Sequence, residues 1–441
     1  MTCLRNPGRL GPAAALAVCL SLVAGAPAAE ESVASPAAPV AEAASDVAPA
    51  VRIDRAALSL RASTWSRSRR LDGDTGVNAV SAWFVGKAAL GESGKAVVDA
   101  WARSDSHLDG RLGGSDAREA YVAGSRGAWD FSLGRQLIVW GRADSVNPTD
   151  VLPARNFTLL VPLDDDQKTG VGTARVTWNL DALRISALWL PEFRASTLPL
   201  PAVPGVSFVA RDPSGAARQW ALRAERSGER VDWAVSFFDG YERQPDLRPE
   251  GLTPGGARVG LAHTRIQMLG ADAAGTLGRY GLRAEVAFTR TADRDGRDPF
   301  TRNSFLYAVA GGDRTFLTSL NVNVQLLYRR VVAWEDPAAA PPALRELALR
   351  QALLSNQRDA EQTGASVRVA RKWWNDTLEA ELSGVSWFAR GDFLVRPRLR
   401  YAATDRVSFT LGGDLYRGPA DSFFGSLRDL STGFFEVQFN L

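Results

Sequence analysis

Stretches in which apolar and polar side chains alternate recur along most of this chain, and they constrain its fold more than any other feature. Leu282, Val286 and Phe288 fall on one face of an extended segment, with Arg283 and Glu285 on the other. Successive side chains of a strand point to opposite faces, so each stretch predicts a strand with one apolar and one polar face. A soluble protein that buries one face of a sheet would show the same pattern. Alternation alone therefore predicts strands and leaves their surroundings open.

The links between these segments distinguish the two settings. From Arg55 onward we count about 18 segments of roughly 8 to 14 residues, joined by links that tend to alternate between short and long. The segments lie near 55–66, 76–87, 95–106, 116–124, 128–139, 170–179, 182–190, 216–226, 230–239, 256–269, 279–290, 303–311, 315–330, 361–373, 376–388, 391–402, 405–416 and 431–441. Bacterial barrels combine short periplasmic turns, long outer loops and an even strand number. The sequence predicts an all-β fold, an antiparallel transmembrane β-barrel of about 18 strands. A count of 16 stays open, because the link near Arg390 is short.

The last nine residues, GFFEVQFNL, predict a closing strand with an apolar face that runs to the chain end. That face consists of Phe435, Val437, Phe439 and Leu441. It resembles the C-terminal assembly signal of Gram-negative outer-membrane β-barrels, in which an aromatic terminal residue is usual; Leu441 departs from that pattern. The resemblance implies the cell outer membrane as location, with the barrel-assembly machinery, outer-membrane lipid and lipopolysaccharide as partners. The final strand of a soluble sandwich is the alternative.

The start of the chain is typical of an exported protein. Arg5 and Arg9 precede an apolar run, and Ala26-Pro27-Ala28 has the small-x-small form of a cleavage site, so residues 1–29 are predicted to be a signal peptide. Residues 30–52, rich in Ala and Pro, are predicted to form a disordered periplasmic tether, and 53–441 the barrel. Both cysteines lie within the signal peptide, so the mature chain would have no thiol.

The charge balance argues against nucleic acid as a partner. Of 52 basic residues, removal of the signal peptide would take away two arginines and no acid, leaving 50 against 49 acidic residues. A nearly neutral chain lacks the basic excess of a nucleic-acid binder.

Tryptophan positions suggest two aromatic girdles at the bilayer interfaces. The residues expected at outer strand ends are Trp65, Trp140, Trp189, Trp220 and Trp387, and those expected at periplasmic ends are Trp129, Trp178, Trp233, Trp373 and Trp374. The alternative is that tryptophan marks strand ends in any sandwich core.

The segment FSLGRQLIVWGRADSVNPTDVLPARNFTLLVPLDDD, from Phe131 to Asp166, contains a long loop without helical or strand periodicity. Its strand with Gly134-Arg135-Gln136, followed by the loop 140–169, resembles porin-type barrels and polysaccharide-export barrels such as the alginate-export porin family. The resemblance implies that the loop folds into the lumen as a constriction. Its candidate residues are Arg142, Asp144, Asp150, Arg155, Asp164, Asp165 and Asp166. A surface loop with solvated charges is the alternative.

Charged residues on the polar strand faces are candidates for the lumen. Arg396, Arg398 and Arg400 share one face about 7 Å apart. The remaining candidates are Arg368, Lys372, Arg329, Arg283 and Glu285. Fixed rows of charge sort solutes by sign. Wall pairs that neutralise one another, for example with Glu379 and Glu381, are the alternative.

Enzymatic activity is not expected, because the two histidines, His107 and His263, have no catalytic neighbour in the sequence. No cofactor or metal site is predicted. The sequence is best interpreted as an outer-membrane channel for passive diffusion of small polar or anionic solutes. An exporter of an acidic polysaccharide and a structural or assembly barrel without conductance remain as alternatives, and a homotrimer and a monomer are both open.

Overall fold

The computed structural model describes residues 51–106, 114–215, 217–317 and 319–441. The predicted signal peptide, His107 and most of the predicted tether lie outside the described residues. Val51 and Arg52, assigned to the tether from sequence, are the first residues of a barrel strand instead.

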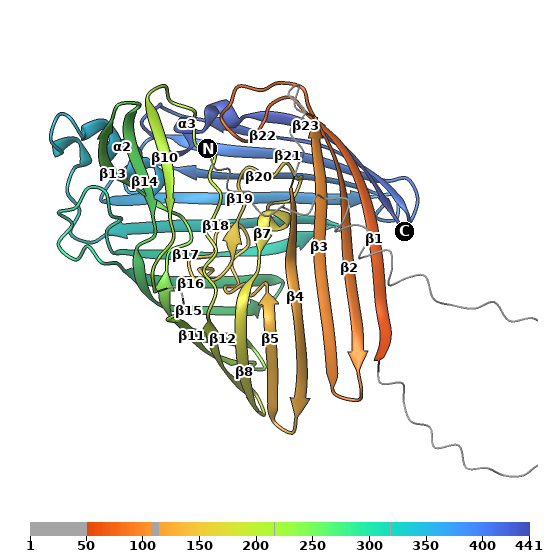
Figure 1. Ribbon diagram of the computed structural model, residues 1–441. Helices are drawn as coiled ribbons and strands as arrows, with labels where there is room; N and C mark the ends of the chain where they lie inside the picture. Colours follow the sequence, from red (N-terminus) through yellow and green to blue (C-terminus); the bar gives the residue numbers. More distant parts are fainter. Residues whose placement is uncertain (1–50, 107–113, 216, 318) are drawn as a thin grey trace, which may run out of the picture.

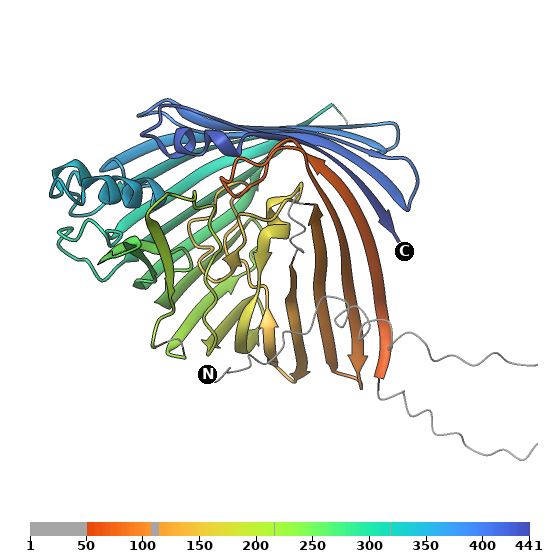
Figure 2. The ribbon, with the colours of Figure 1, turned by 45° about the horizontal axis from the view of Figure 1, so that its top comes forward.

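The barrel consists, within the described residues, of eighteen antiparallel strands in one closed sheet (Figures 1 and 2). They are β1 (Val51–Trp65), β2 (Val77–Leu90), β3 (Gly94–Ser106), β4 (Ser115–Arg126), β5 (Trp129–Gln136), β8 (Val171–Leu180), β9 (Leu183–Leu190), β11 (Gln219–Arg226), β12 (Val231–Tyr241), β15 (Arg265–Leu277), β16 (Tyr280–Arg290), β17 (Phe305–Phe316), β18 (Leu320–Val331), β19 (Glu361–Trp373), β20 (Leu378–Trp387), β21 (Asp392–Ala402), β22 (Val407–Arg417) and β23 (Thr432–Asn440). The predicted fold and the count of 18 are confirmed. The short link at 388–391 is an outer connection of a complete meander.

The first and last strands close the barrel. β23 pairs with β1 from Trp65 opposite Phe434 to Ser59 opposite Asn440. Closure gives the backbone groups of both strands partners, which a strand edge in hydrocarbon would lack. β1 begins and β23 finishes on the same side of the barrel, where every connection has at most four residues. In bacterial barrels the side with short connections is the periplasmic side.

Side-chain exposure follows the alternation of the sequence. On β16, Leu282, Val286 and Phe288 are exposed on the outer surface, whereas Glu285 and Thr289 are buried inside. On β23, Phe435 and Phe439 are likewise exposed while Glu436 is buried, and Leu441, the residue after the strand, is exposed as well. The outside is thus apolar and the inside polar, as a barrel in lipid requires.

The tryptophan prediction was wrong for part of the outer girdle. Trp189 and Trp220 are exposed near outer strand ends, and Trp129, Trp178 and Trp233 near periplasmic ends. The three that are buried inside the barrel are Trp65, Trp140 and Trp387. Trp65 and Trp387 pack against the connection that fills the lumen, and Trp140 belongs to that connection and packs against the wall; strand periodicity reveals neither contact.

The outer connections carry the remaining elements. These are β6 (Ala154–Arg155), η1 (Asp164–Gln167), β7 (Lys168–Thr169), β10 (Val206–Arg211), β13 (Asp246–Thr253), β14 (Gly256–Ala262), η2 (Pro337–Ala339), α2 (Arg345–Leu354), α3 (Phe423–Ser426) and η3 (Arg428–Leu430). In the described ranges, no helix has the length and apolar character needed to cross a membrane. α2 lies in the long connection between β18 and β19.

One predicted strand was wrong. The segment 256–269 divides into β14, which lies in a small sheet with β10 and β13 outside the barrel wall, and the start of the wall strand β15. His263, expected within a strand, lies in the link between them. Burial lowers the pKa of His263, whose Nδ1 contacts the carbonyl oxygen of Glu242 at 2.9 Å.

Three outer loops meet at one buried carboxylate, Asp246, which we call the Asp246 clasp. Asp246 accepts hydrogen bonds from Thr264 at 2.5 Å, Arg302 at 3.1 Å and Gln351 at 2.7 Å. Arg302 belongs to the loop after β16 and Gln351 to α2, after β18. Burial would lower the pKa of Arg302, but Glu242 and Asp246 outweigh it and raise the pKa.

Candidate functional site

The connection between β5 and β8, residues 137–170, lies within the ring of strands (Figure 2). We call it the lumen loop. Its own regular structure is limited to η1 and the short pair β6–β7, in which Ala154 is opposite Thr169. The loop therefore depends on the barrel wall for its position.

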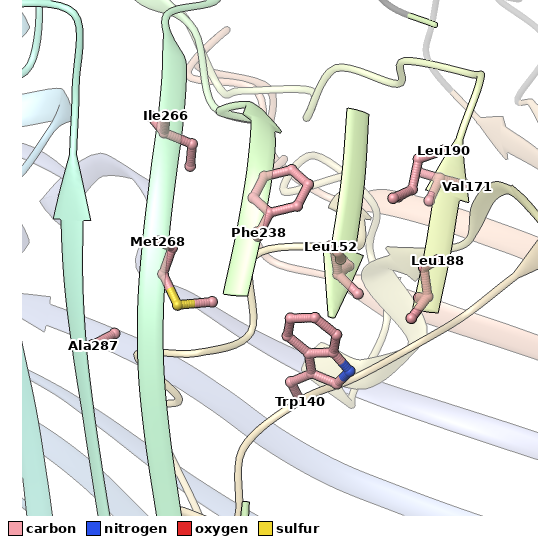
Figure 3. Packing of buried hydrophobic residues seen from close by; sticks show 10 residues of the cluster. Trp140, Leu152, Val171, Leu188, Leu190, Phe238, Ile266, Met268 and Ala287 are labelled. Carbon is pink, nitrogen blue, oxygen red and sulfur yellow. The ribbon is translucent and has the colours of Figure 1, made fainter. Parts of the chain in front are cut away.

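Apolar side chains fasten the first part of the lumen loop to the wall. Trp140 and Leu152 lie in a buried cluster with Phe238 of β12 and with Ile266 and Met268 of β15 (Figure 3). Each of the five is at most 4% exposed. Burial of one large apolar side chain contributes about 1.5–3 kcal/mol, so this cluster is a firm attachment.

Glu285 of β16 holds the same part of the loop by hydrogen bonds. Its carboxylate accepts from the backbone N–H groups of Arg142 at 3.1 Å, Ala143 at 3.3 Å and Thr149 at 2.7 Å, and from the Thr149 hydroxyl at 2.8 Å. Gly141 permits this approach: its φ is +96°, and a Cβ there would lie 2.5 Å from Glu285 Oε2. Glu285, predicted to be a lumen charge, is thus buried and used as a loop support.

A second wall carboxylate supports the loop beside Glu285. Asp272 of β15 is buried and lies 2.7 Å from Nε of Arg142 and 2.9 Å from the guanidinium of Arg223. We call Glu285 and Asp272 together the wall anchor. It holds residues 141–149 with carboxylates that come from the wall.

The last part of the loop is held by carboxylates that come from the loop itself. Asp166 lies 2.7 Å from Arg61 of β1 and 3.9 Å from Arg118 of β4. Asp164 forms an ion pair with Arg396 of β21. We call Asp164 and Asp166 the acid latch. Burial raises the pKa of Asp164, but the nearby arginines, Arg396 foremost, outweigh it and bring the pKa to about 2.

The other charged residues predicted for the loop either pair within the loop or have no ion pair among the described residues. Lys168 lies 3.1 Å from both Asp150 and Asp165. Burial raises the pKa of Asp150, an effect that Lys168 opposes. Asp144 is exposed, and Arg155 has no carboxylate within 4 Å among the described residues, although its guanidinium lies 5.5 Å from the ring of Phe157.

A cavity of about 1160 Å³ remains between the lumen loop and the wall formed by β19 to β22. Its charged lining residues are Asp144, Asp150, Arg155, Asp164, Asp165, Lys168, Glu242, Arg243, Arg368, Glu381, Arg396, Arg398 and Asp414. Both signs are present, and the polar groups sit beside apolar ones such as Val146, Phe157 and Leu163. Such a lining solvates small polar molecules and offers both charge and apolar contact.

The predicted arginine row faces inward, but it is not a free positive wall. Arg396 is paired with Asp164 and lies 3.0 Å from Asp414, and Arg398 lies 3.0 Å from Glu381. Arg400, nearer the periplasmic end, is exposed and has no ion pair in the described part of the chain. Two of the three guanidiniums are therefore compensated.

Of the remaining basic residues predicted for the lumen, two are paired with acids and two are not, within the described part of the chain. Arg368 lies 2.6 Å from Glu381, and Arg283 lies 2.7 Å from Asp313. Lys372 is exposed near the periplasmic end. Arg329 is buried, with its guanidinium 4.3 Å from the ring of Phe305, so it does not line the cavity.

Sequence reasoning missed the arginines that receive the loop and one that lines the cavity. Arg61 and Arg118 bind the acid latch, and Arg243, after β12, lines the cavity with its side chain against Phe193. Burial lowers the pKa of Arg243 to about 10. Arg61 stands on the polar face of its strand, which was a usable signal; Arg243 lies in a connection without period.

A closed barrel of 18 antiparallel strands, apolar outside and polar inside, with a loop folded into its lumen, defines an outer-membrane β-barrel of the porin type and places the chain in the cell outer membrane. No family model and no curated protein sequence matches the chain.

Solved structures resemble the whole barrel. OccAB1 of Acinetobacter baumannii has 9% sequence identity and a TM-score of 0.53, over 88% of this chain and 95% of that one. A BenF-like porin from Pseudomonas fluorescens Pf-5 has 10% identity and a TM-score of 0.52, over 88% and 97%. OpdK of Pseudomonas aeruginosa, in a structure with vanillate, has 12% identity and a TM-score of 0.50, over 88% and 98%. At such identities the likeness establishes the fold, that of Gram-negative outer-membrane porins. The expected similarity to the alginate-export family stays a prediction.

Proposed function

We propose that the protein is an outer-membrane channel through which small polar or anionic solutes diffuse passively. The observation that carries this proposal is the cavity of about 1160 Å³ beside the lumen loop, with charged and polar groups on both of its sides. A barrel that served only as structure would gain nothing from a hydrated, charge-lined space of this size. OpdK, of similar fold, is known in a structure with vanillate, which is an anion.

The cavity lining contains seven acids and six basic residues, so a preference for small anions would come from arginines that have no acid partner. Arg155 at the cavity and Arg400 below it lack carboxylate partners within 4 Å in the described residues. Arg396 and Arg398 are compensated by acids. Single arginines without an acid partner, next to arginines that are paired with acids, can bind one small anion at a time. Export of an acidic polysaccharide would require a continuous row of unpaired arginines.

We further propose that the chain has no enzymatic role and that the apolar face of β23 is recognised by the barrel-assembly machinery. Phe435, Val437, Phe439 and Leu441 alternate with inward-facing polar residues, and lipid with lipopolysaccharide would cover the outer face.

Reconstitution into planar bilayers tests the channel. We expect stable single-channel currents with a moderate preference for anions at low salt, and uptake of small neutral solutes such as acetamide by liposomes that contain the protein. A correctly folded, heat-modifiable barrel that carries no current and admits no acetamide would instead be a structural or assembly barrel.

A further inference from the structure

A group of charged residues lies where the lumen loop meets the seam of β21 and β22. It contains three arginines, Arg69, Arg155 and Arg396, and two acids, Asp164 and Asp414. Asp414 pairs with both Arg69 and Arg396, and Asp164 pairs with Arg396. Arg155 acts on Asp164 only through longer-range attraction. The cluster therefore carries one positive charge in excess.

The two acids of this cluster differ in their access to the cavity. The side chain of Asp414 is 6% exposed and that of Arg69 is 7% exposed, so their pair is enclosed. The side chains of Asp164 and Arg396 are 34% and 28% exposed, and both line the cavity, as does Arg155. Water and small solutes in the cavity can thus reach Arg396 at the position that Asp164 occupies.

Asp164 also differs from Asp414 in its place in the fold. It belongs to the lumen loop, whereas Asp414 is part of the wall strand β22. A solute carboxylate at Arg396 would reproduce the charge-assisted hydrogen bond that Asp164 supplies, so the guanidinium loses nothing in the exchange. During the exchange, the solute carboxylate and Asp164 both lie near Arg396. The excess positive charge, which comes from Arg155, favours this state.

We propose that Arg155 and Arg396 form an exchange site for one carboxylate of a small monoanionic solute, and that Asp164 is the internal carboxylate that occupies it between passages. This inference rests on the proposed channel function and adds a substrate class to it. Asp164 acts as a competitor that sets how tightly the channel holds an anion.

Acetate block of single-channel potassium chloride currents tests the proposal. Asp164→Asn should lower the half-blocking acetate concentration about fivefold, the effect of removing a competing, partly exposed ion pair worth ~1 kcal/mol. Arg155→Gln should raise it, because the cluster then loses its excess charge. Arg155 has no ion pair within 4 Å in the described chain, so this variant should assemble normally.

Asp165→Asn is the matched control. Asp165 is the next residue, lines the same cavity and loses the same charge, but its carboxylate contacts Lys168 and not a wall arginine. We expect its half-blocking concentration to stay near that of the wild type. Equal shifts for Asp164→Asn and Asp165→Asn would overturn the exchange site in favour of a general field effect.

Two further outcomes separate the inference from the channel itself. If Asp164→Asn does not assemble, Arg155→Gln decides, and unchanged acetate block in that variant overturns the proposal. Acetamide uptake by liposomes reports the open path without a carboxylate. Wild type that admits no acetamide overturns the channel, whereas normal acetamide uptake with acetate block insensitive to all three variants overturns the exchange site alone.

Discussion

Carboxylates fasten both parts of the lumen loop to the barrel, but the wall supplies them for the first part and the loop itself supplies them for the last part. At the wall anchor, Glu285 is 2% exposed and receives backbone N–H groups of the loop. At the acid latch, the loop supplies the carboxylates, and Asp164 remains 34% exposed. Hydrogen bonds at a buried carboxylate are costly to break, whereas ion pairs reached by water are weak and screened by salt. The comparison indicates that residues 141–149 are a fixed support, whereas at the acid latch the pair of Asp164 with Arg396 is open to water and Asp166 is only 14% exposed.

Removal of the fixed support should have the largest effect. Glu285→Ala leaves the N–H groups of Arg142, Ala143 and Thr149 buried without an acceptor, at about 1–3 kcal/mol each. A total of ~3 kcal/mol or more lowers the docked population by roughly two orders of magnitude. In planar bilayers we expect larger and noisier single-channel currents.

A second substitution checks the same anchor from the loop side. Gly141→Ala places a Cβ 2.5 Å from Glu285 Oε2 at a φ of +96°, so it should reproduce the noise. Glu379→Ala removes a wall acid that has no hydrogen bond to the lumen loop within the described residues, and it should leave the noise unchanged. Quiet currents in the Glu285→Ala barrel would show that the apolar cluster alone fixes the loop.

Acidification should release the acid latch with a smaller effect. The pKa of Asp164 is about 2 in the docked loop, below the ordinary value of 3.8. The docked state thus binds fewer protons, so this contribution is complete above 3.8 and is lost as pH falls toward 2. We expect current flicker to rise in that window in recordings at stepped pH.

Two comparisons test whether the pH response belongs to Asp164. The Asp164→Asn barrel should flicker at a constant level through the same window. At neutral pH, raising salt from 0.1 M to 1 M should increase the flicker of the wild type, because the Debye length falls from about 10 Å to about 3 Å. A pH response of equal size in Asp164→Asn would assign the transition to another group.

The smallest effect is expected at Arg400, which contacts neither the wall anchor nor the acid latch. Arg400→Ser should leave current noise unchanged and move the reversal potential slightly toward cation preference at low salt. The shift should fade at 1 M salt. A change of all three residues, Arg396, Arg398 and Arg400, to Ser would also break the acid latch, so a selectivity change without added noise in that variant would contradict the present assignment.

The barrel itself could be predicted from the sequence because strand periodicity is a local property. Alternation on segments such as Leu282 to Phe288 located the strands, and link lengths indicated their number. Strand β15 was not recognised in full because its C-terminal half, GADAAGT, consists mostly of small side chains and shows almost no polar contrast between its two faces. Val259 and Leu261 of β14 also gave a competing alternation.

The sequence predicted which charged residues the site contains, but not which partners they contact. The lumen loop and its charges were identified from the prolines and acids of 140–169, but their partners lie far away along the chain. Asp164 meets Arg396, and Thr149 meets Glu285, across the barrel interior. A period-two pattern says that Glu285 faces inward; it does not distinguish a lumen charge from a hydrogen-bond acceptor for a loop.

The Asp246 clasp has a consequence for how the extracellular surface, formed by the outer loops, can vary between related chains. Its carboxylate binds Arg302 and Gln351 from two other loops, so replacement of any one of the three leaves buried polar groups without partners. Sequence drift in these loops would need to be concerted, or be confined to their tips. The four-residue link 388–391 is outside the clasp. Peptide insertions there should be tolerated more readily than in the loops joined at Asp246, which makes this link the natural place to display a foreign epitope.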